Sequence, residues 1–465
     1  MIQNNSPWLQ QLKRTRPAAT LLDDIETDIA IVGGGIAGVA TAYYLIKNTK
    51  KNIVLVEADR IAHGATGHNA GQLASYFERP FSELVGEFGL ELAADGQRAI
   101  ESAWTLLDEI FAEARLRTPM WQFTGYAASR DIEEILVHLK NNAYRLKAGL
   151  NPELIMIAEE SSEVTKIPSM YQALYTLVPQ KDILALLESR DVRHIAALPI
   201  RKGCMNSALF SEEVIGYLLA QYANRFMLAE HAPVERLVLY KDVALLEVCG
   251  DVKITARNVI LCTNGFEKIK ILNTLGSDID TKFHHLVRGA VGYMAGYLEE
   301  FDKSPIAISY LPELQKTGDA FQSQPYFYLT RRPYEGESHE RHNLVCVGGP
   351  ESLMDDTNGY SKSHPYSDEA QEQIDQFLHT TYAHAPTSKI DYKFRWHGLM
   401  GYTPTGVRCI GPEPSNPVLY YNLGCNGVGL LHSIYGGKRI SRYMAGEHVE
   451  PSIFDPKDRL QETKF

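Results

Sequence analysis

Four residues near the N-terminus have the types and spacing needed to bind a nucleotide pyrophosphate. Gly33, Gly35 and Gly38 form a G-x-G-x-x-G motif, and Glu57 follows nineteen residues after the third glycine. The first glycine permits a tight turn, the second lets the backbone approach a pyrophosphate, and the third lets a helix pack closely on a strand. An acidic side chain at the later position can bind a ribose, so the motif predicts a dinucleotide-binding site.

The elements that must position these residues form one βαβ unit. Apolar runs over residues 28–32 and 52–56 predict two buried strands, and residues 36–48 predict the helix between them. The helix N-terminus, with Ile36 and Ala37, would present free N–H groups to the phosphates. A glycine-rich turn in another α/β protein is the alternative, but it leaves Glu57 and the third glycine unexplained.

A second loop of small and polar residues follows the unit and distinguishes a flavin from a nicotinamide. Its small residues let the backbone lie against a cofactor and its polar residues offer hydrogen bonds; they are Ala65, Thr66, Gly67, His68, Asn69, Gly71 and Gln72. A flavin needs such a loop because its pyrophosphate and ring extend past the first turn. The position of the motif close to the N-terminus is also usual for FAD enzymes.

In this loop the chain resembles the D-amino-acid oxidase-like FAD oxidoreductases, which include glycine oxidase, sarcosine oxidase and gamma-glutamylputrescine oxidase. The family's stretch is G-A-S-G-R-N-G-G, where this chain has Thr66, His68 and Ala70 at the differing places. Residues 232–234 and 256–265 resemble the family's second cofactor stretch, and 326–330 and 344–349 resemble strands of its substrate domain. This resemblance implies that Val234 holds the adenine and that Thr263 and Gly265 lie at the cofactor.

Residues 395–429 resemble the C-terminal flavin-binding end of the same family. The resemblance places Gly401, Gly427, Val428, Gly429 and Leu430 at the flavin. The glycine loop precedes a helical stretch over 430–444, whose N–H groups could stabilise the negative charge of a reduced flavin.

The candidate substrate-binding residues have weaker signals. His397, between Trp396 and Gly398, is the candidate catalytic residue, since a neutral imidazole could hold or deprotonate a substrate amine; packing against Trp396 is the alternative. Arginines that could bind a carboxylate and tyrosines that could form pocket walls are Arg288, Arg331, Arg395, Tyr293, Tyr326, Tyr328 and Tyr402.

Departures from the family narrow the substrate class. The lysine that sarcosine oxidase-like enzymes carry after the C-terminal glycine loop has no counterpart before Lys438, and Gly398 lies near the place of their flavin-linked cysteine. The N-terminal segment resembles the gamma-glutamylputrescine oxidase branch instead, which implies a longer amine or polyamine derivative. His68 lies near the register of a flavin-linked histidine in the dimethylglycine dehydrogenase branch, but we expect non-covalent FAD.

Length and pattern predict an α/β protein with two domains: a discontinuous Rossmann-like FAD-binding domain and an α+β substrate domain built on a large mixed sheet. We expect the first at 1–82, 200–275 and 393–465 and the second at 83–199 and 276–392. Helices are expected over 82–118, 132–147, 151–165 and 367–382. A meander that returns to a parallel strand is expected over 234–264.

Charge and cysteine usage exclude several classes of protein. The net charge of −11 argues against a nucleic-acid partner. The six cysteines form no metal-binding or redox pair, so no metal is expected, and Cys249, Cys262, Cys346 and Cys409 should be buried thiols. Because no apolar stretch suits a signal peptide or a transmembrane segment, we expect a cytoplasmic protein.

These observations together predict an FAD-dependent oxidoreductase that oxidises a C–N bond in a small-molecule amine or amino acid. Hydride transfer to flavin N5 would give an imine that hydrolyses, and oxygen or another acceptor would reoxidise the flavin. Two alternatives stay open: an FAD-dependent 2-hydroxy-acid dehydrogenase, with His397 as base, and a non-catalytic or redox-sensing flavoprotein.

Overall fold

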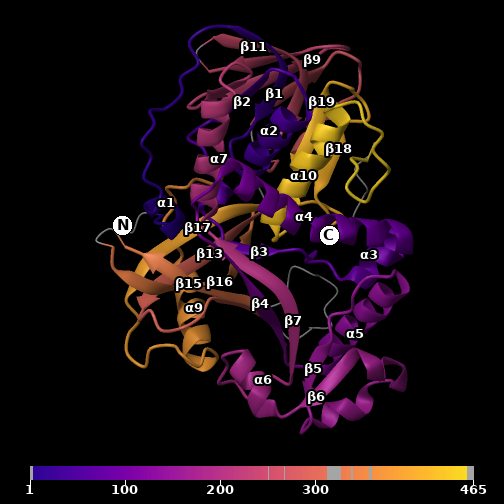
Figure 1. Cartoon of the computed structure of the whole chain (residues 1–465), viewed down its shortest axis with the longest axis vertical. Coiled ribbons are helices and arrows are strands. Elements are labelled where there is room, and N and C mark those ends of the chain that lie inside the picture. Colours follow the sequence, from indigo (N-terminus) through magenta and orange to yellow (C-terminus); the bar gives the residue numbers. More distant parts are fainter. Residues whose placement is uncertain are drawn as a thin grey trace.

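The computed structural model describes the 465-residue chain except residues 1–3, 250, 266–267, 312–325, 337–338, 355–358 and 458–465. Two large sheets dominate these residues, one in the upper half and one in the lower half of Figure 1. The chain crosses several times between the two sheets, so residues far apart in the sequence meet where the sheets adjoin.

The upper sheet has nine strands in the described chain and contains the predicted βαβ unit. Its strands are β1 (Ile25–Val32), β2 (Ile53–Val56), β8 (Phe226–Ala229), β9 (Val234–Leu239), β10 (Ala244–Val248), β11 (Val252–Leu261), β12 (Lys270–Asn273), β18 (Cys409–Pro412) and β19 (Leu419–Leu423). β1 is parallel to β2 and β11, and β11 is parallel to β19. The meander β9–β10–β11 therefore returns to a parallel strand, as the sequence predicts.

The lower sheet has ten strands in the same part of the chain and is mixed. They are β3 (Gln72–Ala74), β4 (Met120–Ser129), β5 (Ile155–Ala158), β6 (Tyr175–Val178), β7 (Ala196–Met205), β13 (Arg288–Glu299), β14 (Ile306–Tyr310), β15 (Phe327–Glu335), β16 (Arg341–Leu353) and β17 (Tyr392–Tyr402). The path β17-β13-β16-β15-β14 is antiparallel until β14 meets β4, to which it is parallel.

Helices cover both sheets. They are α1 (Pro7–Gln10), α2 (Ile36–Asn48), α3 (Phe81–Phe88), α4 (Leu90–Ala114), α5 (Ile132–Lys147), α6 (Gln180–Leu186), α7 (Ser207–Gln221), α8 (Ile279–His285), α9 (Asp368–Thr380) and α10 (Gly429–Met444), with 3₁₀ turns at Ala65–Gly67, Ser162–Lys166 and Ser169–Leu174. Residues 36–46 of α2 are buried throughout, because the helix lies between the upper sheet and other helices (Figure 1). At Gly437 a Cβ would lie 2.7 Å from the backbone of Ala40, so α10 packs very closely on α2.

The structure confirms the predicted fold class and corrects two local expectations. Residues 151–165 are not helical, because the short apolar run 155–158 pairs as β5 with β6 and β7. Cys249 is exposed rather than buried, since it lies in the turn after β10, whereas Cys262, Cys346 and Cys409 are buried as expected. The helix expected at 367–382 is α9, and Ser367 caps it by accepting a hydrogen bond from Ala370 N at 3.2 Å.

Sheet membership bears on where the chain passes between domains. β3, β7, β13 and β17 all lie in the lower sheet, so the chain crosses between the sheets just before residue 72, after residue 205, between residues 273 and 288, and after residue 402. The domain ranges expected from the sequence stay a prediction.

No helix in the described ranges is both long and apolar enough to cross a membrane. The cytoplasmic location likewise stays a prediction.

Candidate functional site

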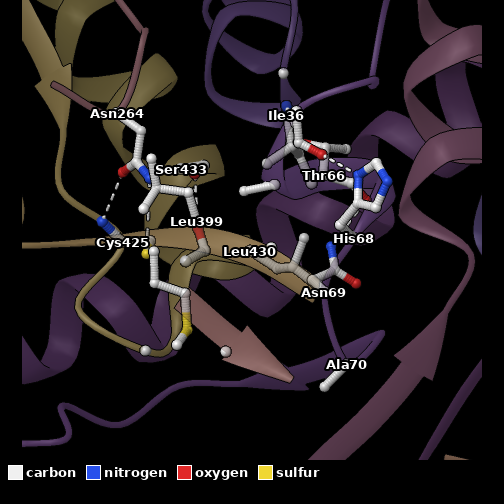
Figure 2. Close-up of a pocket in the computed structure, with 18 of the residues that line it drawn as sticks. Ile36, Thr66, His68, Asn69, Ala70, Asn264, Leu399, Cys425, Leu430 and Ser433 are labelled. Atoms are coloured by element: carbon white, nitrogen blue, oxygen red, sulfur yellow. Dashed lines mark hydrogen bonds between the residues drawn. The ribbon is translucent and has the colours of Figure 1, made fainter. Parts of the chain in front are cut away.

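A cavity of about 430 Å³ is lined by residues of both sheets. One end of it reaches the glycine turn after β1, and the other reaches Tyr326 and Tyr328 around the start of β15. The close-up in Figure 2 shows the 66–70 loop, the start of α2 and the residues around Cys425 facing the same space. Segments distant in the sequence therefore build one continuous site.

The glycine turn has no room for side chains. A Cβ on Gly33 would lie 2.7 Å from the carbonyl oxygen of Cys262, and its φ of +108° lies in the region that favours glycine. A Cβ on Gly38 would lie only 1.9 Å from the Gly33 carbonyl oxygen. Gly35 differs, because a Cβ there would meet only the Thr66 hydroxyl at 3.1 Å and would face the cavity. The turn thus leaves backbone exposed to a ligand.

Glu57 lies at the end of β2, beside this turn. Its carboxylate accepts hydrogen bonds from Gly34 N at 2.6 Å and Asp59 N at 2.9 Å. Burial raises the pKa of this carboxyl group, and the two N–H donors oppose that shift. Nearby, Lys362 pairs with Asp59 at 3.0 Å, so charged groups surround this end of the cavity.

The loop at 64–72 is fixed from several sides. Thr66 Oγ1 accepts a hydrogen bond from the first N–H of α2, at Ile36, over 2.9 Å (Figure 2). The indole N–H groups of Trp8 and Trp396 donate to the carbonyl of Asn69 at 2.6 and 3.2 Å. These contacts come from distant parts of the chain and hold the loop against the cavity before any ligand binds.

His68 lies in this loop and lines the cavity. Its Nδ1 lies 3.0 Å from the Gly64 carbonyl oxygen, which can only accept, so Nδ1 carries the proton and Nε2 holds a lone pair. Burial lowers the pKa of His68 to about 4, and the imidazole is therefore neutral near pH 7.

The C-terminal segment closes the cavity. Asn264 Oδ1 accepts from Cys425 N at 3.1 Å, and α10 begins at Gly429 with its first N–H groups at the cavity wall (Figure 2). Arg408 also lines the wall, but it donates to Asn422 and to the carbonyl of Gly424. Burial lowers the pKa of Arg408 to about 10, which leaves the guanidinium charged.

Most of the residues predicted to bind the cofactor lie together in this lining: Gly33, Gly35, Ile36, Ala37, Glu57, Ala65, Thr66, His68, Asn69, Gly71, Gln72, Thr263, Gly427, Val428, Gly429 and Leu430. Gly38, Gly67, Gly265, Gly401 and Val234 lie outside it. The four glycines are packed against neighbouring atoms behind the wall. Val234 is a buried residue at the start of β9.

His397, the candidate catalytic residue, is outside the cavity lining, and its ring is engaged elsewhere. Its Nδ1 lies 3.1 Å from the Tyr360 hydroxyl and its Nε2 lies 3.0 Å from the His364 carbonyl oxygen. Since both ring nitrogens have partners and the ring is buried against Tyr293, the geometry supports the packing role. Its neighbours in β17, residues 398–400, are the ones that reach the cavity.

The arginines proposed as carboxylate binders are also absent from this lining. Arg331 is buried, makes two hydrogen bonds to the Glu188 carboxylate at 2.5 and 2.7 Å and one to Tyr382, so its donors are already used. Arg288 starts β13 opposite Tyr402 in the register. Of the predicted substrate residues, Tyr326 and Tyr328 lie in the lining, and Tyr402 donates to a carboxylate that does, Glu351.

Sequence reasoning missed the charged residues at the tyrosine end of the cavity. Glu78 and Glu351 line the cavity with Tyr76 and Ser309, and Lys202 lies behind them, fully buried, with its ammonium 2.9 Å from the Ser309 hydroxyl. No motif marks these positions, because they come from separate strands and loops that only the sheet topology brings together.

The family comparison identifies the class of protein that this fold and site define. Residues 28–443 match the family model described as FAD dependent oxidoreductase, which includes nearly the whole chain, and the chain belongs to that family. Its cofactor is FAD. The family and the cofactor predicted from the sequence are thereby confirmed.

Particular relatives share parts of the sequence or the whole fold. Gamma-glutamylputrescine oxidoreductase of Escherichia coli (strain K12) is 35% identical over 89 residues, 19% of this chain and 21% of that protein. A Rieske 2Fe-2S iron-sulfur protein of Bacillus subtilis (strain 168) is 26% identical over 189 residues, 39% of this chain and 37% of that protein. The chain thus spans well under half the length of these curated relatives.

Solved structures match over almost the entire chain. Glycine oxidase from Geobacillus kaustophilus has a TM-score of 0.65 at 13% identity, covering 94% of this chain and 99% of that one. L-proline dehydrogenase from P. horikoshii has a TM-score of 0.64 at 14% identity, covering 93% and 97%. At such identities the likeness establishes the fold.

Proposed function

We propose that this protein oxidises a C–N bond of a small amine or amino acid with FAD. The observation that carries the proposal is the single cavity that joins a dinucleotide-binding turn to a pocket lined with tyrosines and carboxylates. The printed names of its relatives and structural neighbours, among them glycine oxidase, L-proline dehydrogenase and gamma-glutamylputrescine oxidoreductase, support this reaction class.

The residues at the glycine turn suit the adenosine and pyrophosphate of FAD. The bare backbone at Gly33–Gly35 and the N-terminus of α2 offer N–H groups to the phosphates. Glu57 has a carboxylate beside the turn for the ribose hydroxyls. The 64–72 loop and the start of α10 would then bind the flavin, and the α10 N–H groups would stabilise negative charge on the reduced ring.

When bound, FAD supplies a hydride acceptor at N5. The substrate C–H bond next to nitrogen breaks with its electron pair, the nitrogen lone pair forms the C=N bond, and an N–H proton leaves. Water then hydrolyses the imine to a carbonyl compound and an amine, and oxygen or another acceptor takes the two electrons. The chain contributes binding and orientation, because the carbon must lie within about 3–3.5 Å of the acceptor atom.

The alternatives predicted from the sequence make different demands. Oxidation of a 2-hydroxy acid requires a base for the hydroxyl group, and the residue proposed for that task, His397, has both ring nitrogens engaged outside the cavity. A redox-sensing flavoprotein needs no substrate pocket, whereas the cavity continues past the flavin loops to Tyr326 and Tyr328.

Anaerobic mixing of the FAD-loaded protein with a panel of amines, amino acids and 2-hydroxy acids tests the proposal. We expect the flavin absorption to bleach with at least one nitrogen compound and with none of the hydroxy acids. In air, peroxide release with that compound would identify oxygen as the acceptor. Bleaching by a hydroxy acid alone, or by no member of the panel while dithionite still reduces the flavin, would contradict the proposal.

A further inference from the structure

Two carboxylates line the tyrosine end of the cavity, and among the described residues only the buried Lys202 ammonium lies near one of them. Glu78 follows β3, and Glu351 lies near the end of β16, so they approach the cavity from different segments. Tyr326 donates to Glu78 at 3.0 Å, and Tyr402 donates to Glu351. Neither carboxylate lies within ion-pair distance of a cation among the described residues, although the Lys202 ammonium behind the wall attracts Glu78 and partly offsets the rise in its pKa.

The positive groups near the cavity are used elsewhere. Arg408 donates to Asn422 and the Gly424 carbonyl, and Lys362 pairs with Asp59 at the opposite, Glu57 end. Lys202 donates to Ser309 from behind the wall; burial lowers its pKa to about 8, and the charge of Glu78 opposes that shift. Within the described lining, therefore, no free cation is available for a substrate carboxylate.

The negative charge of Glu78 makes ionisation of Glu351 less favourable unless a cation binds beside them. Burial and the charge of Glu78 raise the pKa of Glu351 to about 7, and burial raises the pKa of Glu78. Both side chains stay accessible to solvent through the cavity. A cation placed between them would offset this repulsion, and charge-assisted hydrogen bonds are stronger than neutral ones.

Aromatic rings complete the same end. Tyr76, Tyr326 and Tyr328 line the cavity beside the two carboxylates, and the rings of the last two lie 5.7 Å apart. Aromatic faces attract ammonium groups, whereas they offer nothing to a carboxylate. The tyrosine rings and the two carboxylates therefore both favour a ligand that carries an ammonium group.

We infer that the substrate is an amine carrying a second, protonated amine that binds between Glu78 and Glu351, rather than an α-amino acid. This inference rests on the proposed C–N oxidation. The amine next to the C–H bond must be neutral to form the C=N bond, so the bound ammonium is a separate group. A di- or polyamine meets both requirements, and an α-carboxylate would face the two glutamates without a partner.

Binding of matched four-carbon probes tests the inference on the FAD-loaded protein. We expect calorimetry to give a Kd for 1,4-diaminobutane at least about tenfold lower than for 1-aminobutane, and little or no binding of 4-aminobutyrate. Glu78→Gln and Glu351→Gln should each remove most of the preference for the diamine, and Glu372→Gln on the exposed face of α9 should keep it. The flavin spectrum verifies that each variant is folded and loaded.

Equal affinities for the three probes, or tighter binding of 4-aminobutyrate, would overturn the inference. The unmodified protein already decides this, even if a variant does not fold. Anaerobic bleaching of the flavin is a separate readout. A preference for the diamine without bleaching supports the binding site and contradicts the proposed oxidation. Bleaching by amines without this preference supports the oxidation and contradicts the binding site.

Discussion

The two ends of the cavity are built from different parts of the chain. At the glycine turn, backbone atoms form the wall, and the Glu57 carboxylate accepts hydrogen bonds from two backbone N–H groups. At the tyrosine end, side chains form the wall, and within the described chain Glu78 and Glu351 accept hydrogen bonds from the hydroxyls of Tyr326 and Tyr402. The polar groups of the first end are thus already hydrogen-bonded, as suits the cofactor that we propose there, while the second end has negative charge available for the proposed substrate.

The strongest test of the glycine-turn end of the cavity is Gly35→Val. The φ of −75° at Gly35 suits valine, and a Cβ there meets only the Thr66 hydroxyl at 3.1 Å, so the protein should fold. The side chain would displace the pyrophosphate, and we expect soluble, colourless protein. Gly86→Val, on the open surface of α3, is the matched control and should stay yellow. A fully loaded Gly35→Val variant would mean that the phosphates bind elsewhere.

Glu57→Ala should weaken FAD binding by about ten- to hundredfold, since it removes a charged acceptor worth about 1.5–3 kcal/mol. The variant also frees the N–H groups of Gly34 and Asp59, which adds to the loss. Titration of the apoprotein with FAD measures the effect. Glu57→Gln keeps one acceptor oxygen, so its FAD affinity should lie between those of the original protein and Glu57→Ala. Unchanged affinity in both variants would contradict the ribose assignment.

At the tyrosine end of the cavity, the affinity for 1,4-diaminobutane should depend on pH. The pKa of Glu351 lies at about 7, so the carboxylate that attracts the ammonium forms as the pH rises through that value. Tyr402 stays neutral, because its pKa is well above the ordinary value, and an alkyl ammonium stays charged. We expect Kd to fall about tenfold from pH 6 to pH 8, by the ratio of ionised carboxylate. Glu351→Gln should flatten this dependence, and a Kd that rises with pH would contradict it.

His397→Ala separates packing from chemistry. Because both ring nitrogens bond outside the cavity, the rate of anaerobic flavin reduction should stay within about twofold of the original, a change below 1 kcal/mol. Stability should fall by about 1–3 kcal/mol, since Tyr360 loses a buried partner. Denaturant unfolding measures this loss. A large drop in the reduction rate at full FAD content would restore the catalytic role.

The smallest expected effect concerns His68. Its neutral ring lines the cavity with an unprotonated Nε2, so covalent attachment to the flavin is chemically open. In the dimethylglycine dehydrogenase branch, which this loop resembles, a tryptophan precedes the linked histidine, whereas this chain has Gly67 there. We therefore expect acid precipitation to leave all of the flavin in the supernatant. A fluorescent pellet with a flavin adduct on the His68 peptide would show the opposite.

The fold could be predicted from the sequence wherever a local residue pattern determines the local structure. The βαβ unit, the meander and the Ser367 cap each depend on neighbouring residues, so periodicity and residue type predict them. The strand at 155–158 was missed because four apolar residues have no clear period, and its pairing with β7 decided its conformation. Cys249 was assigned to the core for the same reason, although a turn exposes it.

The sequence by itself determined the cofactor end of this protein. Gly33, Gly35, Gly38 and Glu57 act through backbone geometry within one local unit, and their spacing therefore carries the information. Only the tertiary structure decided the tyrosine end, where we propose that the substrate binds. Glu78, after β3, and Glu351, in β16, both line the cavity because both strands belong to the lower sheet, whereas the ring of His397 bonds to Tyr360 and the His364 carbonyl outside the lining. A charged side chain interacts through space, so its effect depends on residues that are close in the folded structure but distant in the sequence.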